Sequence, residues 1–421
     1  MHTRHALVLA SAFALALAGP LATSAASAPT PPDPQPAPLI RAGDPIPGRY
    51  VVTLDPLVDA AKTAQKLGLA PTFTYSKALN GFAVPLTPAQ LTTLRATPGV
   101  TSVEEDAKNS VPASESIPAY APVPASRAAN TSRAAAAVPA RLAPASTWGL
   151  DRIDQRNPPL DGDFTAGGDG AGVTAYILDS GIDYQHTEFG GAGGTRASFG
   201  FDAVGDGRLG ADCHGHGTHV AGTVAGSTYG VAREASLVSV RVLDCGGAGS
   251  SSGLIAGLDW VAKNAVQPAV LNGSLGGGKS QAVNRATTAL STAGILPVIA
   301  AGNDARNACD VSPASADGAL TVAASDRTDA QTSFSNWGDC VTLYAPGQDI
   351  VSARIGGGSV SRSGTSMAAP HVTGLAALYK QAHPDAGSAE VAAWIDEVST
   401  RDVLTGVSQG TPNHLLFTDG L

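Results

Sequence analysis

Short apolar segments alternate with helical stretches through the last two-thirds of the chain, and this alternation is the feature that most limits its fold. The apolar segments are 173–178, 237–242, 269–271, 295–300, 320–323 and 341–344. Strands that alternate with helices form parallel sheets, because each crossover helix returns the chain to the same edge of the sheet. We therefore predict an α/β fold with a doubly wound, mostly parallel sheet for residues 146–421.

Residues 48–110 have the pattern of a smaller, separate α+β domain. Strand patterns at 50–54, 73–75, 81–84 and 100–104 alternate with helical patterns at 58–67 and 88–97. The Pro-rich residues 29–47 precede this domain, and the Ala/Pro/Ser-rich residues 111–145 follow it. Both compositions are typical of linkers.

Residues 1–28 have the organisation of a secretory signal peptide. Arg4 and His5 precede an apolar run from Ala6 to Ala18, and small residues follow that run. A membrane-spanning helix needs about 20 apolar residues, so the run favours a cleaved signal over an anchor. We expect a secreted, extracellular, monomeric protein that has no membrane partner.

The overall charge argues against nucleic acid as a partner. The formal net charge of the chain is −9 at pH 7. Proteins that bind nucleic acid neutralise phosphates with a surplus of Lys and Arg, and this chain has no such surplus.

Three separated segments carry residue types that acyl transfer requires. Asp179 ends an apolar strand pattern, at the sheet edge where ligands bind in open α/β folds. His216 lies in a run of histidines and small residues, 214–222. Ser366 precedes the apolar helix pattern 372–379, and a helix N-terminus favours a negative charge that forms beside it.

Each segment alone also has an ordinary structural interpretation. Asp179 is in a typical place for a turn residue, and Ser366 for a helix cap. His214 and His219 are compatible with packed histidines, and no HExxH motif supports a zinc site. Together, however, they supply a nucleophile, a base and a carboxylate in the order Asp, His, Ser, which is the order of subtilisin.

Residues 179–181, 216–222 and 364–371 resemble the three signature blocks of the subtilisin-like serine endopeptidases, the subtilases. Residues 146–418 are similar to the proteinase K and aqualysin branch, with further shared stretches at 148–153, 240–245, 312–315 and 333–336. Residues 48–110 resemble the inhibitory propeptide of the same family, most clearly at 78–83 and 98–104.

The resemblance implies a role for each block. Asp179 would orient the imidazole, His216 would act as general base and then acid, and Ser366 would be the nucleophile. Asn303, in the block 298–303, would donate its side-chain N–H to the oxyanion alongside the Ser366 backbone N–H. Catalysis of this kind needs no cofactor.

The resemblance also implies where a polypeptide substrate binds. A broad primary pocket for apolar or aromatic side chains is expected from residues that are mostly small: Ser274, Leu275, Gly276, Gly277, Ala300, Ala301 and Gly302. Gly247, Ala248 and Gly249 match an edge strand that pairs with extended substrate through backbone hydrogen bonds, which tolerate many sequences.

The four cysteines suggest two disulfides, since an even number in an exported chain favours pairing. Three pairings are possible from the sequence. The resemblance to the aqualysin branch implies Cys213–Cys245 and Cys309–Cys340, and the first bridge would brace the segment of His216.

Structural calcium is implied by the resemblance, but the ligands are not. The branch commonly places a carboxylate just before the turn 344–347, where this chain has Thr342, while Asp317 lies in the other segment of that site. We expect some calcium dependence without assigning its ligands.

The propeptide resemblance and the linker 111–145 together predict a zymogen. The propeptide would inhibit its own peptidase domain by occupying the substrate cleft. A first self-cleavage is expected near residues 108–115, followed by trimming towards 140–146. Two other classes, a non-catalytic binding protein and an esterase or lipase, are disfavoured by the three intact blocks and by the missing GxSxG motif.

Overall fold

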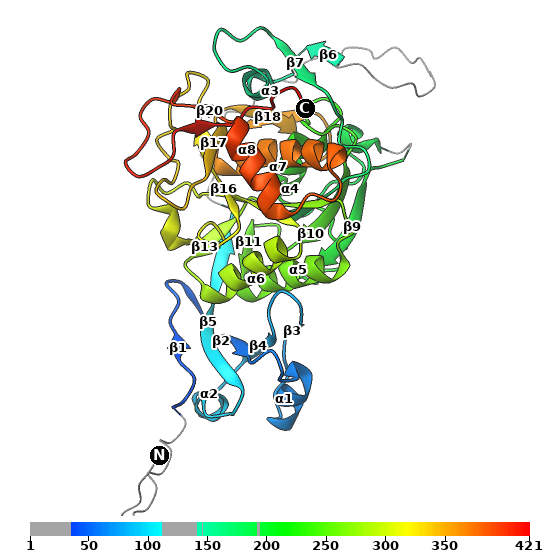
Figure 1. The fold of residues 1–421 in the computed structure, drawn as a ribbon. Coiled ribbons are helices and arrows are strands. Elements are labelled where there is room, and N and C mark those ends of the chain that lie inside the picture. Colours follow the sequence, from blue (N-terminus) through cyan, green and yellow to red (C-terminus); the bar gives the residue numbers. More distant parts are fainter. Residues whose placement is uncertain (1–34, 112–140, 145, 192–193) are drawn as a thin grey trace, which may run out of the picture. The chain divides into compact units, whose positions relative to one another are not determined.

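The computed structural model describes residues 35–111, 141–144, 146–191 and 194–421 (Figure 1). The expected signal peptide and most of the linker 111–145 lie outside the described residues. In the described part, no helix has both the length and the apolar character needed to cross a bilayer.

The larger domain is built on a nine-stranded sheet in the order β20-β21-β17-β16-β14-β12-β8-β10-β9. Its strands are β8 (Thr174–Asp179), β9 (Ala197–Asp202), β10 (Ser236–Arg241), β12 (Ala269–Gly273), β14 (Leu296–Ala300), β16 (Leu320–Ser325), β17 (Leu343–Pro346), β20 (Thr400–Arg401) and β21 (His414–Leu415). All neighbours from β9 to β21 pair in parallel, and only β20 is antiparallel. The predicted doubly wound, mostly parallel sheet is confirmed.

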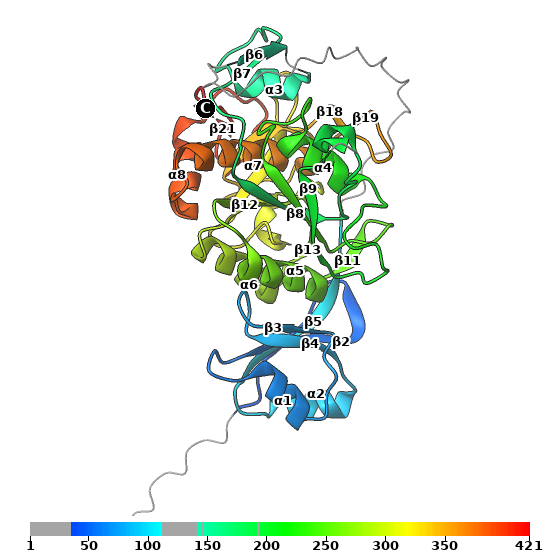
Figure 2. The same ribbon diagram turned by 90° about the vertical axis from the view of Figure 1, so that its right-hand side faces the viewer.

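Helices cover both faces of this sheet because its strands are apolar on both faces (Figure 2). Along β8, Ala175 and Ile177 belong to one core, while Tyr176 and Leu178 belong to the other. The first core includes residues of α4 (His216–Ala225), α7 (Thr365–Ala382) and α8 (Ser388–Val398), and the second includes residues of α5 (Ser251–Asn264) and α6 (Gln281–Thr292).

Smaller elements complete this domain. They are β6 (Arg141–Pro144), α3 (Trp148–Ile153), β7 (Asp163–Ala166), the 3₁₀ turns η1 (Thr187–Phe189) and η3 (Ala308–Asp310), and the hairpin β18 (Ile350–Ala353) with β19 (Ser359–Arg362). Because β6 pairs with β7, the sequence taken as linker up to residue 145 joins the peptidase domain at its end.

The smaller domain contains β1 (Leu39–Ile40), β2 (Pro45–Leu54), α1 (Ala60–Lys66), β3 (Phe73–Tyr75), β4 (Gly81–Pro85), α2 (Pro88–Arg95) and β5 (Val100–Ser110). It has its own core, with Val52, Phe82 and Val103 fully buried. The sheet begins earlier than the composition suggested: β1 pairs in parallel with β5, so part of the Pro-rich segment 29–47 is structured.

Strand β5 belongs to both domains. It pairs with β2 in the smaller domain, and its end lies between β11 (Ala248–Ser250) and β13 (Gly276–Gly278) of the larger one. β13 pairs in turn with β15 (Val311–Ser312). In Figure 1 this strand is the long cyan ribbon that runs up into the larger domain.

Candidate active site

Asp179 and His216 form a buried pair at the carboxyl edge of the main sheet. Both Asp179 oxygens lie close to His216 Nδ1, at 2.9 and 3.0 Å. Asp179 is fully buried and His216 is 3% exposed. A carboxylate at this distance holds the proton on Nδ1, which leaves Nε2 free to accept one.

Two contacts hold His216 in this position at the first turn of α4. Gly217 packs so closely that a Cβ there would stand 2.2 Å from the Gly181 carbonyl oxygen. Asp212, three residues before the N-cap residue Gly215, binds the start of the helix: its carboxylate accepts from Gly215 N and from both the N–H and the hydroxyl of Thr218, at 2.6 to 3.0 Å. The imidazole is therefore positioned by backbone contacts that only glycine and a capping acid allow.

Ser366 lies in the first turn of α7, beside the end of β12. Its hydroxyl donates to the Ser274 carbonyl oxygen at 3.2 Å, and the Ser274 hydroxyl donates to the Ser366 carbonyl oxygen at 3.0 Å. The preceding residue of β12, Gly273, pairs with Leu178 of β8, so Ser274 and Asp179 end neighbouring strands. The structure thus brings Ser366 to the same edge as Asp179 and His216, with its hydroxyl turned to Ser274.

Asn303 is anchored by Thr365, the residue that directly precedes Ser366. Its Oδ1 accepts from the N–H and hydroxyl of Thr365, at 2.9 and 2.8 Å. Since a backbone N–H can only donate, this contact identifies the oxygen and leaves Nδ2 as the free donor. Nδ2 lies 2.9 Å from where a Cβ on Gly364 would stand, and a side chain there would block the donor.

Of the two neighbouring histidines, His219 is fully buried and His214 is partly buried. Burial lowers the pKa of His219 to about 3 and also lowers the pKa of His214. His219 is in hydrogen-bond contact with the Ile350 and Val360 carbonyl oxygens, at 3.0 and 3.1 Å. His219 therefore has the surroundings of a packed residue.

A cavity of about 340 Å³ opens beside Ser366. Of the residues predicted for the primary pocket and edge strand, those that line it are Ala248, Leu275, Gly276, Gly277, Ala300 and Gly302. Ser274 and Ala301 are buried behind it. Asp304 and Arg306, which the sequence did not single out, add an exposed ion pair to the lining.

The end of β5 occupies the strip between β11, which contains the predicted edge strand, and β13, which belongs to the predicted primary pocket. Ser110 pairs antiparallel with both Ala248 and Gly276, and Val111 N donates to the Gly247 carbonyl oxygen at 3.0 Å. The backbone of the smaller domain is therefore held in the extended form in which a polypeptide would lie.

Buried carboxylates fix the smaller domain to α5 and α6. Asp106 accepts from Ser252 N and Oγ, and Glu104 accepts from Ala282 N, so each acid lies at a helix N-terminus. In the opposite direction, Asp259 of α5 accepts from three successive backbone N–H groups, those of Ser76, Lys77 and Ala78. Burial raises the pKa of Glu104.

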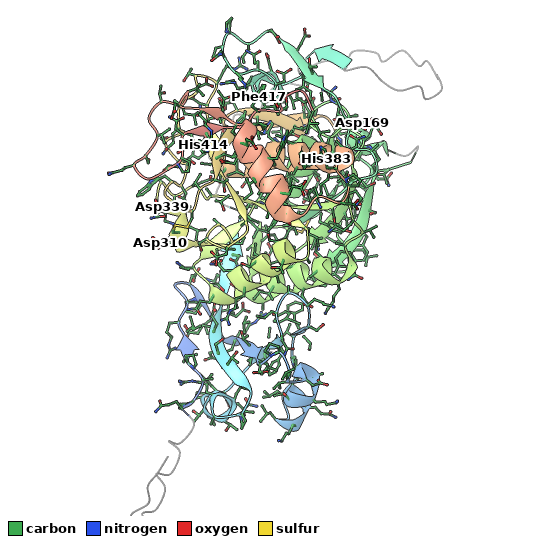
Figure 3. All side chains as sticks on the ribbon, viewed as in Figure 1. Asp169, Asp310, Asp339, His383, His414 and Phe417 are labelled. Atoms are coloured by element: carbon green, nitrogen blue, oxygen red, sulfur yellow. A yellow bond between two sulfur atoms is a disulfide. The ribbon has the colours of Figure 1, made fainter. Side chains whose placement is uncertain are left out.

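Both disulfides implied by the resemblance are present. Cys213–Cys245 joins the segment before His216 to the turn after β10, and Cys309–Cys340 closes the second loop. Figure 3 labels Asp310, which follows Cys309, and Asp339, which precedes Cys340. Among the described residues, one group of three side chains holds potential metal-ligand atoms close together, Asp206 with Cys213 and Cys245. The two sulfurs of this group are bonded to each other in the first bridge.

The calcium position suggested by the resemblance does not fit a hard cation. Thr342 exchanges hydrogen bonds with Thr321 instead, and Asp317 is exposed. An acidic segment at and after the end of α3 contains Asp151, Asp154 and Asp161, whose charges act on one another although their oxygens do not form a close three-ligand group among the described residues. Asp154 Oδ1 is buried without a donor, and burial followed by these neighbouring acids raises the pKa of Asp154 to about 6.

Several residues of this site escaped the sequence analysis. They are Asp212, Thr365 and Asp259. Each forms hydrogen bonds with partners that only the folded chain brings close. Asp212 lies three residues before the N-cap residue Gly215, so it shows no ordinary capping signal in the sequence.

Comparisons with known proteins agree with this geometry. Residues 170–416 match the subtilase family, and residues 58–111 match the peptidase inhibitor I9 family. The chain is 43% identical over 411 residues to an extracellular serine proteinase of Thermus sp. (strain Rt41A), covering 91% of this chain and 92% of the relative. It is 44% identical over 344 residues to alkaline serine exoprotease A of Vibrio alginolyticus, covering 82% and 59%.

A solved structure agrees as well. The crystal structure of a cold-adapted subtilisin-like serine proteinase aligns with a TM-score of 0.63 at 47% identity. The alignment covers 65% of this chain and 98% of that one. The chain therefore belongs to the subtilase family of serine endopeptidases and carries an I9 inhibitor domain ahead of its peptidase domain.

Proposed function

We propose that this chain is a secreted endopeptidase that hydrolyses peptide bonds through Ser366, His216 and Asp179 and is made as a self-processing zymogen. The observation that carries the proposal is the contact of both Asp179 oxygens with His216 Nδ1, at the sheet edge that Ser366 shares. Export is supported by the signal-like residues 1–28 and by the printed name of the Thermus relative.

In acylation, His216 Nε2 takes the Ser366 proton as Oγ attacks the substrate carbonyl carbon. A rotation about the Ser366 side chain has to exchange its present bond to Ser274 for one to Nε2, as is common before substrate binds. Asp179 stabilises the imidazolium that forms, and His216 then returns the proton to the leaving amine. Water repeats the sequence to release the acyl group.

The tetrahedral oxyanion would accept from Asn303 Nδ2 and from the Ser366 N–H. Thr365 holds the Asn303 amide in place before the reaction begins. Such preorganised donors act without reorganisation at the moment of reaction, and losing one costs about 10²–10³ in turnover.

Broad specificity follows from backbone recognition beside an open pocket. The residues 276–278 and Gly302 offer no side chains, so the cavity next to Ser366 accepts large groups. We expect a preference for apolar or aromatic residues before the cleaved bond.

The I9 domain would inhibit the precursor in the manner of a bound product. β5 takes the place of substrate between β11 and β13, and Ser110 at its end lines the cavity beside Ser366. Cleavage near residues 108–115 would free the tail, and trimming towards 140–146 would follow.

Calcium, where it binds, would be held by Asp151, Asp154 and Asp161 and would act on stability. Calcium takes oxygen ligands, and it would neutralise the carboxylate repulsion in this segment.

The test compares the secreted wild-type protein with Ser366→Ala on casein and on a lipid ester. We expect casein hydrolysis by the wild type alone, with N-terminal sequencing placing the first cleavage in 108–115. Hydrolysis of the ester but not of casein, or an active enzyme that starts near residue 29, would contradict the proposal.

A further inference from the structure

Arg362, at the end of β19, is a cation that the proposed mechanism does not use. Its side chain is partly buried, and its Nε is fully buried without a hydrogen-bond partner. Across the described residues, no hydrogen bond or ion pair engages its guanidinium. An unpaired charge in such a place is costly, so its presence calls for a partner.

The guanidinium lies beside the residue that precedes the catalytic histidine. Its Nη2 is 3.6 Å from where a Cβ on Gly215 would stand, and Gly215 directly precedes His216. Its positive charge contributes to the lowered pKa values of His214 and His219. Burial lowers the pKa of Arg362 itself, against the opposing influence of Asp212 and Asp179.

Asp212 and Asp179 act on Arg362 through space only, because their oxygens accept hydrogen bonds from other groups. Asp212 accepts from the Ser180 hydroxyl and from N–H groups at the start of α4. Asp179 accepts from His216 and from Ser180 N. The guanidinium therefore keeps its donors for a group that comes from outside.

Arg362 lies outside the part of the cleft proposed to bind the acyl half of the substrate. That part is the strip between β11 and β13 and the cavity beside Ser366, and Arg362 lines neither. In the proposed mechanism His216 protonates the amine that leaves, and Arg362 lies next to Gly215, which directly precedes His216. Resting on the proposed peptidase function, we propose that Arg362 determines specificity on the leaving-group side, where it binds an acidic side chain just after the cleaved bond.

The chain's own sequence offers a substrate of this kind. Among residues 111–145, Glu115 is the only Asp or Glu, and it follows shortly after Val111, where the paired strand ends. A peptide with the sequence of residues 107–118 would therefore place a carboxylate on the leaving side.

The test uses the mature enzyme and quenched fluorescent peptides of that sequence. The peptides differ only in carrying Glu, Gln or Lys at residue 115 or at either neighbouring position. For the wild type we expect kcat/KM to be about tenfold higher with Glu than with Gln at the best position, the effect of one charge-assisted hydrogen bond. The preference should shrink at high ionic strength.

Variants separate charge from folding. In Arg362→Gln, the ratio of kcat/KM for the Glu peptide to kcat/KM for the Gln peptide should be about one. Arg362→Glu should favour the Lys peptide, and Arg362→Lys should keep part of the preference for the Glu peptide. Arg354→Gln is the matched control: its side chain donates to Gly357 at the exposed turn of the same hairpin, and its ratio should equal that of the wild type.

The outcomes are distinct. An unchanged Glu/Gln ratio in Arg362→Gln, or a Glu preference only before the cleaved bond, would overturn the role of Arg362 and leave the peptidase function standing. Failure of the wild type to cleave even the Gln peptide would overturn both.

Discussion

Replacing Asp259 by alanine in the mature enzyme should weaken inhibition by the I9 domain without touching catalysis. One Asp259 oxygen accepts from three successive backbone N–H groups of that domain, at 3.0, 2.6 and 2.8 Å. In the variant these donors would be covered by α5 with no acceptor. Asp259 is in neither the cavity beside Ser366 nor the paired substrate strip.

The magnitude follows from that contact. A hydrogen bond to a charged group contributes about 1.5–3 kcal/mol, and three bonds that share one oxygen are not additive. We therefore expect the variant to lose between about 2 and about 4 kcal/mol of binding free energy for the I9 domain. The inhibition constant should then rise by roughly 30- to 1000-fold.

The assay titrates each mature enzyme with the same separately produced I9 domain, residues 36–111, and follows peptide hydrolysis. The inhibitor is identical in all titrations, so its own cost of folding cancels from the comparison. Lys263→Ala is the control, because it removes only the half-exposed partner of Asp259 and should change inhibition little. An inhibition constant within threefold of wild type for Asp259→Ala, or an altered KM, would refute the reasoning.

Three further predictions concern the peptidase domain. Gly217→Ala should lower kcat/KM at least about 100-fold, since its Cβ would push His216 from Asp179; near-normal kinetics would contradict this. Burial holds the pKa of His371 at about 4, below the unfolded 6.5, so its contribution to stability is lost as pH falls below 6.5, at about 1.4 kcal/mol per pH unit. Urea unfolding of the Ser366→Ala protein at several pH values measures this loss. With His371→Asn added, the free energy of unfolding should fall less steeply as the pH is lowered, and an equally steep fall would contradict the prediction. The pKa of Asp154 is raised to about 6, so the charged carboxylate destabilises the folded protein. This destabilisation is absent below about pH 4 and complete above pH 6. In chelator at pH 8, Asp154→Asn should therefore raise the melting temperature, and added calcium should stabilise the wild type more than the variant; the opposite order would exclude the site.

The fold was predictable because its signals are local. The central strands β8, β12, β14, β16 and β17 bury side chains on both faces, so their apolar runs are visible in the sequence, and Asp179 is found simply as the residue that ends β8. Asn303 and the disulfide pairing came through resemblance, since spacing alone left three pairings open.

The remainder depends on partners distant along the chain. Residues 105–110 are mostly polar and show no strand pattern; residues 108–110 are extended because β11 and β13 bond to their backbone, and Glu105 and Ala107 pair with β2. For the same reason Leu39 and Ile40, in a Pro-rich context, were assigned to a linker and are paired with β5 instead. Asp259 has no local signal, because its donors lie about 180 residues earlier in the chain.

The most direct measurement of the central claim is labelling of the mature enzyme by a peptidyl phosphonate, with the modified residue mapped by mass spectrometry. The account predicts one label per molecule, on Ser366, with matching loss of activity, and very slow labelling in His216→Ala and Asp179→Asn. Labelling of another residue, or the same rate after His216 is removed, would contradict it.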